Sequence, residues 1–389
     1  MEKIFNNTQK AFELKSDTEL NRAYFLFKMI QSAPLVKLGT SLTNFALKLH
    51  LPVESIIKFT IFDHFCGGVS ETDCLKVVDQ MYTKKVSSVL DYSVEGKEDD
   101  AQFDAAVRMT IKTIEFAKER EAIPFAVFKP TGIGKISLYE KVGAKETLTA
   151  EEQKEWDAVV KRFHTICETA YKKDVMLLVD AEESWMQDAA DDLCEDMMRL
   201  YNKEKAIIFN TAQFYRWDRL DYLKKLYAVS QRDGFHIGMK VVRGAYMEKE
   251  NLRAQERGYK SPICESKEAT DINYNKGIQF MLNHLETMHL FAGTHNEDSA
   301  YTLMQYMQDK NIPKNTNNIW FGQLYGMSDN MSYNLSDKGY NIAKYLPFGP
   351  VRDVVPYLVR RAEENTSVAG QTSRELNLIV TERNRRKSK

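Results

Sequence analysis

Hydrophobic and polar positions follow two different patterns along the chain. In residues 21–30, 34–51, 54–65 and 71–82, apolar side chains recur at spacings of three and four, a pattern that predicts amphipathic helices. Gly67 and Gly68 separate the last two segments, and Ser70 followed by Asp73 is typical of a helix start. We therefore expect a helical arm that packs on the main body or on a partner.

From residue 86 onward, short apolar runs with β-branched residues alternate with longer amphipathic runs. The short runs predict strands at residues 86–92, 125–128, 175–179, 206–209, 237–242, 289–293, 319–324 and 342–346. The longer runs predict helices at residues 101–120, 150–172, 185–203, 218–233, 271–287, 298–310 and 349–364. Strands that alternate with helices must be parallel, because each strand returns through a helical crossover. Eight such units in about 280 residues fit a closed (β/α)8 barrel of the TIM type, an α/β fold.

The predicted organisation has three parts. Residues 1–83 form the helical arm, residues 84–365 the barrel, and residues 366–389 a helical and basic tail. The last eight residues read ERNRRKSK, and we expect them to be a frayed, solvated end.

Composition limits the function classes. The 389 residues are 43% hydrophobic and 28% charged, which excludes a disordered or collagen-like chain. Lys and Arg number 54 against 55 Asp and Glu, a net charge of −1, so no excess charge would hold nucleic acid. Five cysteines without a CxxC pair or zinc spacing indicate reduced thiols. No uncharged apolar run approaches the ~18 residues of a membrane span. With no signal or transit peptide pattern at the start, we expect a cytoplasmic protein.

Polar residues stand where nearly every predicted strand ends. They are Asp91, Lys129, Asp180 with Glu182 and Glu183, Gln213, Arg243 with Tyr246, Thr294 with His295 and Asn296, Gln323 with Tyr325, and Tyr345. In a barrel, the carboxyl ends of the strands carry the chemistry. The set predicts a polar pocket at one mouth, although strands that simply emerge into polar loops would account for some of these positions.

Several interpretations are open for the residues after the second and third strands. Lys129 and Asp180 come from neighbouring strands and could form a structural ion pair, or Lys129 could meet an anionic substrate. Asp180 and Glu182 with His295 could instead hold a divalent cation in a metal-dependent lyase. Acidic residues at this place also complement a helix N-terminus.

Two further motifs suggest anion binding. Arg243 is followed by the small residues Gly244 and Ala245, so the backbone could approach a phosphate there. Arg360 and Arg361 are adjacent in the last predicted helix and could grip a carboxylate. The Arg pair could equally be a solvated helix face with acidic neighbours.

Taken together, these motifs resemble proline dehydrogenases, the flavin-dependent (β/α)8 enzymes of proline catabolism. The similar stretches occur in the order of that family and extend over the predicted barrel. They are Phe128-Lys129-Pro130, Val179-Asp180-Ala181-Glu182-Glu183, Thr211-Ala212-Gln213, Lys240-Val241-Val242-Arg243-Gly244-Ala245-Tyr246, Thr294-His295-Asn296, Gln323-Leu324-Tyr325-Gly326-Met327, and Tyr357-Leu358-Val359-Arg360-Arg361-Ala362-Glu363-Glu364-Asn365.

The resemblance implies a role for each matching residue. Arg360 and Arg361 would bind the proline carboxylate with Lys129, and Asp180 would orient this network. Lys240 would lie beside the reactive edge of the flavin. The pyrrolidine ring would be walled by Leu324, Tyr345 and Tyr357. FAD would be held by Ala181, Gln213, Val242, Arg243, Gly244, Ala245, Thr294, His295 and Glu364.

The implied reaction is oxidation of L-proline to Δ1-pyrroline-5-carboxylate, with hydride transfer from C5 to flavin N5. Asp180, Tyr246 or water could take the proton from the proline nitrogen. The resemblance also implies a quinone as electron acceptor, and with it a peripheral contact at the inner face of a membrane. A 4-hydroxyproline dehydrogenase, the metal-dependent lyase with Asp180, Glu182 and His295, and a non-catalytic helical scaffold are the alternative functions.

Overall fold

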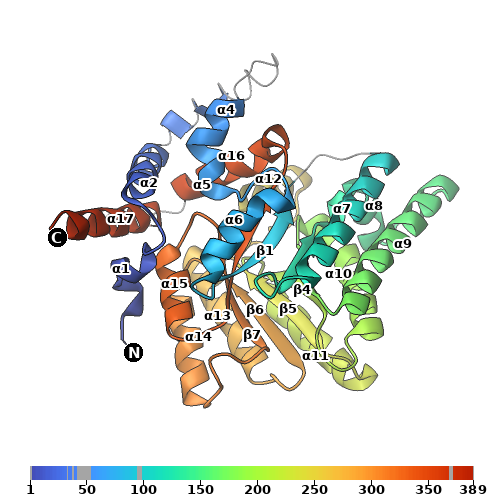
Figure 1. Cartoon of the computed structure of the whole chain (residues 1–389). Coiled ribbons are helices and arrows are strands. Elements are labelled where there is room, and N and C mark those ends of the chain that lie inside the picture. The colour runs from blue at the N-terminus through green and yellow to red at the C-terminus, as the bar shows by residue number, and fades with distance from the viewer. Residues whose placement is uncertain are drawn as a thin grey trace. The chain divides into compact units, whose positions relative to one another are not determined.

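Eight parallel strands form a closed barrel in which neighbours follow the order of the chain, from β1 to β8. The computed structural model (Figure 1) describes residues 2–32, 34–36, 39–41, 54–93, 99–367 and 371–388. The strands are β1 (Ser87–Tyr92), β2 (Phe125–Phe128), β3 (Met176–Val179), β4 (Ile208–Gln213), β5 (Ile237–Val242), β6 (Met288–Gly293), β7 (Ile319–Leu324) and β8 (Ile342–Phe348). The predicted (β/α)8 fold is confirmed.

The chain divides into two compact units. One unit contains Gly96–Gly322, and the other contains Met1–Glu95 together with Gln323–Lys389. The boundaries predicted at residues 83 and 365 stay predictions.

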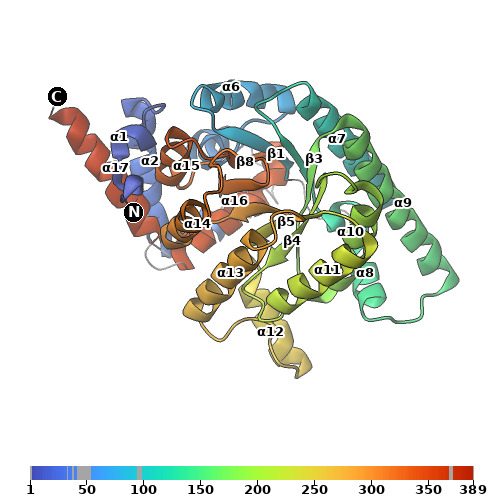
Figure 2. The ribbon, with the colours of Figure 1, turned by 90° about the horizontal axis from the view of Figure 1, so that it is seen from below.

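The unit of Gly96–Gly322 carries the repeating strand–helix part of the fold. Its helices are α7 (Asp100–Lys118), the 3-10 turn η3 (Pro130–Gly132), α8 (Ile136–Gly143), α9 (Ala150–Lys173), α10 (Ser184–Tyr201), α11 (Arg219–Asp233), α12 (Met247–Arg257), α13 (Lys267–Leu282) and α14 (Glu297–Asp309). Figure 2 shows α7, α8, α9 and α10 together on one flank, where α8 packs on α10 and α7 on α9. Every residue of β2 and β4 is buried, as expected for parallel strands covered by helices.

The other unit joins both ends of the chain. Its helices are η1 (Ile4–Asn6), α1 (Thr8–Ala11), α2 (Asp17–Ile30), α4 (Glu54–Ile57), a π-helical turn η2 (Lys58–Phe62), α5 (Asp63–Phe65), α6 (Glu71–Tyr82), α15 (Asp329–Asp337), α16 (Val351–Ser367) and α17 (Gln371–Lys387). β1 pairs with β8 in the register Ser87↔Ala343. Most of the helix predicted at residues 34–51 lies outside the described residues.

Helix starts in the arm follow local capping chemistry. The Ser70 side chain accepts a hydrogen bond from the backbone N–H of Asp73, so the predicted start of α6 is confirmed. α2 begins four residues before its predicted start, because Ser16 and Glu19 form a capping box at its N-terminus. The apolar periodicity did not include this polar first turn.

The prediction of a frayed C-terminal end is wrong. α17 is a helix docked against α1 and α2 (Figure 1), with Leu378 and Ile379 buried in an apolar cluster of the arm. The Arg386 guanidinium donates to the carbonyl oxygens of Phe12 at 2.8 Å and Lys15 at 2.9 Å. Charged residues of this helix thus bind to the arm as well. In the sequence alone, where these partners are not visible, the same residues look like a solvated tail.

The helices α8, α12 and α15 were not predicted. α12 is largely polar, and of its residues only Glu250 and Ala254 are buried, so no apolar stripe marks it. In the described part of the chain, no helix is both long enough and apolar enough to cross a bilayer.

Candidate active site

The unit of Gly96–Gly322 places the predicted site residues at the ends of successive parallel strands. Lys129 follows β2, Asp180 and Ala181 follow β3, and Gln213 ends β4. Lys240 and Val242 belong to β5, while Thr294 and His295 follow β6. The carboxyl ends of parallel strands lie at one edge of a sheet, so these side chains share the edge that the sequence predicted.

Lys240, which is buried, and Asp180, which is partly buried, form an ion pair across this edge. The Lys240 ammonium donates to Oδ1 of Asp180, and the two side chains are only 7% and 15% exposed. Removing one partner would take away a direct charge–charge contact in a place largely shielded from water. The pair therefore holds a cation and an anion in fixed places, a partnership that the sequence reasoning had not identified.

Glu182 ties the segment after β3 to its neighbours. Its carboxylate accepts from the backbone N–H of Thr131 at 2.9 Å and from the Thr131 hydroxyl at 2.6 Å. Its carbonyl oxygen accepts from Nε2 of Gln213 at 2.6 Å. Burial raises the pKa of Glu182 to about 7. Glu182 thus holds the Gln213 side chain through its carbonyl oxygen, and it fixes the segment after β3 to Thr131 through its carboxylate.

These contacts weaken the metal-lyase alternative. Glu182 is engaged by Thr131, and Asp180 by Lys240. Within the described ranges, no three His, Cys, Asp or Glu side chains gather as a metal-binding group.

Arg243 is held by side chains of this unit. Its Nε donates to Asp271 at 2.6 Å, and its terminal nitrogens donate to the hydroxyls of Thr294 and Ser299, each at 2.9 Å. The guanidinium carbon also lies 4.4 Å from the ring centroid of Tyr274. Arg243 and Thr294, both predicted cofactor residues, are therefore brought together.

The turn after β5 requires glycine. Gly244 has φ +135°, a conformation that side chains rarely adopt, and a Cβ there would lie 2.6 Å from the ring of Tyr215. Gly244 and Ala245 are exposed. A bulky residue at Gly244 would therefore disturb the turn itself, apart from any effect on a ligand.

α12 clamps this turn to the segment after β3. Glu250 is fully buried and accepts from the backbone N–H and the hydroxyl of Ser184, both at 2.6 Å. Lys249 pairs with Glu183 at 3.0 Å. Sequence reasoning missed α12 because its contacts are polar.

The second unit holds the remaining predicted residues. Leu324 ends β7, Tyr345 lies in β8, and Tyr357 and Arg361 lie on α16. Tyr345 and Tyr357 are 8% and 5% exposed, and the Arg361 guanidinium lies 5.2 Å from the centroid of the Tyr357 ring. Arg360 is half-buried, and the side chain of Glu364 lies outside the described part of the structure.

The apolar face of α16 packs on the arm. Val354, Val355 and Leu358 share one buried cluster with Leu26 and Phe62. The helix that carries the Arg pair is thus fixed by its apolar face. The two arginines are half-exposed, so the alternative of a solvated face with acidic neighbours stays open for them.

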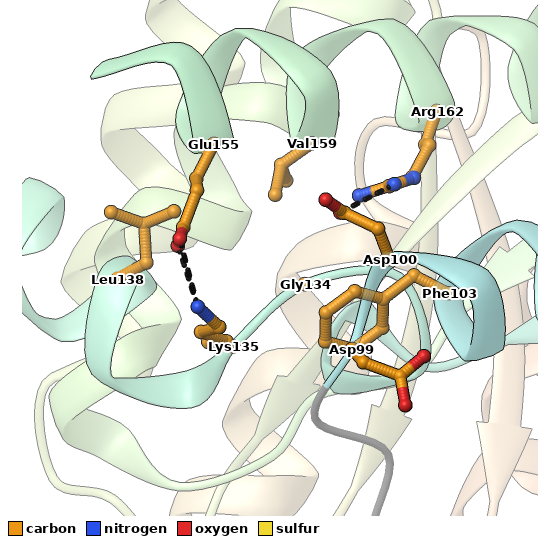
Figure 3. Close-up of a pocket in the computed structure, with 9 residues that line it drawn as sticks. All are labelled: Asp99, Asp100, Phe103, Gly134, Lys135, Leu138, Glu155, Val159 and Arg162. Carbon is orange, nitrogen blue, oxygen red and sulfur yellow. Dashed lines mark hydrogen bonds and ion pairs between the residues drawn. The ribbon is translucent and has the colours of Figure 1, made fainter. Parts of the chain in front are cut away.

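A separate surface pocket lies among the outer helices of the first unit. It has a volume of about 230 Å³ and is lined by residues near the start of α7 and along α8 and α9 (Figure 3). Two ion pairs lie in its wall, Lys135 with Glu155 at 2.8 Å and Arg162 with Asp100 at 2.7 Å. None of the predicted site residues lines this pocket.

Comparisons with known proteins agree with the motifs. A family model described as "Proline dehydrogenase" matches residues 74–374. The chain is 30% identical to "Proline dehydrogenase 1, mitochondrial" of Dictyostelium discoideum, over 95% of this chain and 73% of that protein. It is 34% identical to "Carbapenem antibiotics biosynthesis protein CarD" of Pectobacterium carotovorum subsp. carotovorum, over 92% of this chain and 94% of that protein.

A solved structure has the same fold. Proline utilization A from Bdellovibrio bacteriovorus, inactivated by N-propargylglycine, matches with a TM-score of 0.71 and 20% identity, over 92% of this chain. This chain spans 38% of the length of that protein. With the family match over most of the barrel and the relatives of 30% identity or more, the chain belongs to the proline dehydrogenase family.

Proposed function

We propose that this protein oxidises L-proline to Δ1-pyrroline-5-carboxylate, with FAD as its cofactor. The observation that carries the proposal is the ion pair of buried Lys240 with Asp180 at the β5 and β3 ends, in a chain of the proline dehydrogenase family. A fixed, buried cation at the strand exits is suited to stabilise negative charge that develops on a nearby group.

The residues at these strand ends fit FAD. Lys240 supplies a buried ammonium group, and the exposed turn with Gly244 presents backbone to a phosphate. Gln213 and Arg243 would hold the cofactor with Ala181, Val242, Ala245, Thr294, His295 and Glu364. When bound, FAD supplies the acceptor for the hydride that leaves C5 of proline.

The residues of the chain would bind and orient the substrate. Arg360 and Arg361 would grip the carboxylate with Lys129, because a guanidinium donates two parallel hydrogen bonds to a carboxylate. Leu324, Tyr345 and Tyr357 would enclose the ring and exclude water. Asp180 would hold the Lys240 side chain in place.

The test compares wild type with Lys240→Met and Lys240→Arg, each assayed for proline oxidation and for FAD affinity of the apoprotein. We expect Lys240→Met to lose most activity, because it removes the ammonium group that bonds to Asp180, and Lys240→Arg to retain part of it. Full activity in Lys240→Met would show that the Lys240–Asp180 pair is not needed for proline oxidation.

We further propose a quinone as electron acceptor and a peripheral contact with a membrane. Support comes from the outer surface of the arm, where Phe25, Met29 and Phe59 are 61%, 52% and 68% exposed. Arg22 lies 5.9 Å from the Phe59 ring centroid, and Lys28 is exposed on α2. Apolar and basic side chains together suit an anionic lipid surface.

Vesicle flotation tests this contact. Phe25→Ser combined with Phe59→Ser should reduce flotation with anionic vesicles and with them the rate of quinone reduction. Exchange of the exposed Leu200, which lies on α10, for Ser serves as control. Equal flotation of all three proteins would contradict the contact.

A further inference from the structure

A network of buried charges joins both ends of the chain behind the predicted ring-binding residues. Asp329 at the start of α15 accepts from Lys15 of the arm at 3.2 Å and from Lys344 of β8 at 2.8 Å. Lys344 is fully buried. Although burial alone would raise the pKa of Asp329, the two ammonium groups hold it well below its usual range. Asp329 is therefore an anion at the centre of this network.

Lys344 connects the network to the turn after β7. Its ammonium donates to the carbonyl oxygen of Met327 at 2.7 Å and lies 3.5 Å from that of Leu324. The backbone N–H of Tyr325 donates to the carbonyl oxygen of Tyr345 at 2.8 Å. Leu324 and Tyr345 are thus held relative to one another by bonds that include Lys344.

Lys344 and Tyr345 are neighbours in β8, and their side chains lie on opposite faces of the strand. Side chains of successive strand residues point to opposite faces, and the Lys344 side chain contacts Asp329. Tyr345 therefore points to the opposite face of the strand. The charged network lies behind the face that carries the ring-binding residue.

The C-terminal helix completes the network through Glu375 of α17. This side chain is 5% exposed, and its carboxyl oxygen accepts the backbone N–H of Ser328 at 2.5 Å. Ser328 has φ +51°, a left-handed conformation that is unfavourable for a residue with a side chain. The bond from Glu375 supports this conformation, at the point where the turn after Leu324 becomes α15.

The arm supports the same turn from another side. Nε2 of His64 lies 3.0 Å from the carbonyl oxygen of Gly326. Burial lowers the pKa of His64 to about 3, so the ring is neutral and its Nε2–H is the donor. Gly326 has φ +81°, and a Cβ there would lie 2.4 Å from the His64 carbonyl oxygen. Arm and turn are therefore in close contact.

We propose that Glu375, Asp329 and Lys344 are positioning residues that set the shape of the substrate-ring wall, so that the two chain ends tune specificity for the ring of the substrate. This inference rests on the function proposed above, and it assigns a role to the arm and to the C-terminal helix. The network acts on Leu324 and Tyr345, whereas Arg360 and Arg361 would bind the carboxylate.

The test compares a ligand that has both ring and carboxylate with a ligand that has the carboxylate alone. Cyclopentanecarboxylate has the ring and the carboxylate without an oxidisable nitrogen, and acetate has only the carboxylate. The dissociation constant of each is measured by titration of the FAD-loaded full-length protein. The ratio of the acetate constant to the cyclopentanecarboxylate constant reports the contribution of the ring wall alone.

We expect Glu375→Ala to lower this ratio at least about fivefold, the equivalent of losing contact with one to two ring methylenes. Glu375→Gln should stay within about twofold of wild type, because its amide oxygen can still accept from Ser328. A second variant, Lys344→Met, removes the bonds to Met327 and Leu324 and leaves Glu375 intact. We expect it to lower the ratio too, so the inference can be tested even if Glu375→Ala does not fold.

Glu382→Gln is the matched control. Glu382 is a buried carboxylate of the same helix that pairs with Arg385 and Arg386, so its exchange can lower the melting temperature but should leave the ratio unchanged. A wild-type ratio in folded, flavin-loaded Glu375→Ala or Lys344→Met would overturn the inference. A wild type that binds neither carboxylate would overturn the proposed function and the inference with it.

Discussion

At the scale of single residues, the predicted chemistry rests on charges that the fold fixes in place. Lys240 and Asp180 neutralise one another in a buried position, and Arg243 is held by Asp271, Thr294 and Ser299. Long cationic side chains would otherwise lose much conformational freedom on binding a ligand. Because neighbouring residues already hold Lys240 and Arg243, these side chains lose their conformational freedom during folding, and ligand binding does not have to restrict them again.

The Arg pair of α16 should determine the affinity for the substrate carboxylate. We expect Arg360→Ala and Arg361→Ala each to raise KM for proline about ten- to a hundredfold, the equivalent of roughly 1.5–3 kcal/mol for one charge-assisted hydrogen bond. Arg352→Ala is the control, because this arginine lies on the same helix and pairs with Glu54 at an exposed place. Unchanged KM in both variants would exclude the carboxylate role.

Tyr345 should set the preference between proline and its hydroxylated form. If its ring lies against C4 of the bound pyrrolidine, a 4-hydroxyl would lose hydration without gaining a partner, which costs on the order of 1–3 kcal/mol. We expect wild type to favour proline over trans-4-hydroxyproline at least about tenfold in kcat/KM, and Tyr345→Ser to narrow the gap. Equal wild-type activity on both substrates would move the assignment to hydroxyproline.

The protonation of Glu375 should make stability depend on pH. Burial raises its pKa to about 7, with a further contribution from Asp329, against 4.5 in the unfolded chain. The native state therefore retains a proton that the unfolded state releases, and stability is lost as the pH rises from about 4.5 to about 7. The melting temperature of wild type should fall relative to that of Glu375→Gln over this interval.

The difference between the two proteins isolates this carboxyl from other groups with a similar pKa. Glu182 and Glu195 also have a pKa of about 7, but both are present in wild type and in Glu375→Gln. Parallel melting curves from pH 5 to pH 8 would show that Glu375 does not titrate in this range.

At the scale of elements, the pattern of apolar residues predicted the strands, which are held by apolar contacts. The eight predicted strands are present, and β2, β5 and β7 have the predicted bounds. Each of these strands is a run of mostly buried residues bounded by polar ones, so its pattern is visible in the sequence. Candidate residues at the strand ends followed from the same pattern.

Elements held by polar contacts were not predictable in this way. α12 is fixed by Glu250 and Lys249, and in α17 the Arg386 guanidinium donates to the carbonyl oxygens of Phe12 and Lys15. A charged residue in a sequence indicates a solvated position unless its partner is known, and the partners are far away along the chain. The Lys240–Asp180 pair, 60 residues apart, escaped prediction for the same reason.

α12 offers a test at this scale. Glu250→Ala should loosen the contact between the turn after β5 and the segment after β3, because Ser184 loses a buried acceptor. We expect weaker FAD binding by the apoprotein, with Glu250→Gln close to wild type. Glu248→Ala, on an exposed position of the same helix, serves as control, and equal FAD affinity in all variants would contradict the clamp.

At the scale of the whole molecule, both chain ends belong to the same compact unit as β8 and α16. The arm covers the apolar face of α16, and α17 reaches the turn after β7 through Glu375. The ends of the chain thus support elements that carry predicted substrate residues.

The most direct test of the proposed function is the absorbance of the purified protein during anaerobic addition of L-proline. We expect the visible bands of bound flavin to bleach on addition, with Δ1-pyrroline-5-carboxylate formed in equal amount to the flavin reduced. Arg361→Ala should require a higher proline concentration for the same bleaching. A protein that binds flavin but keeps its bands unchanged at saturating proline, or that purifies with a divalent metal and takes up no flavin, would contradict the proposal.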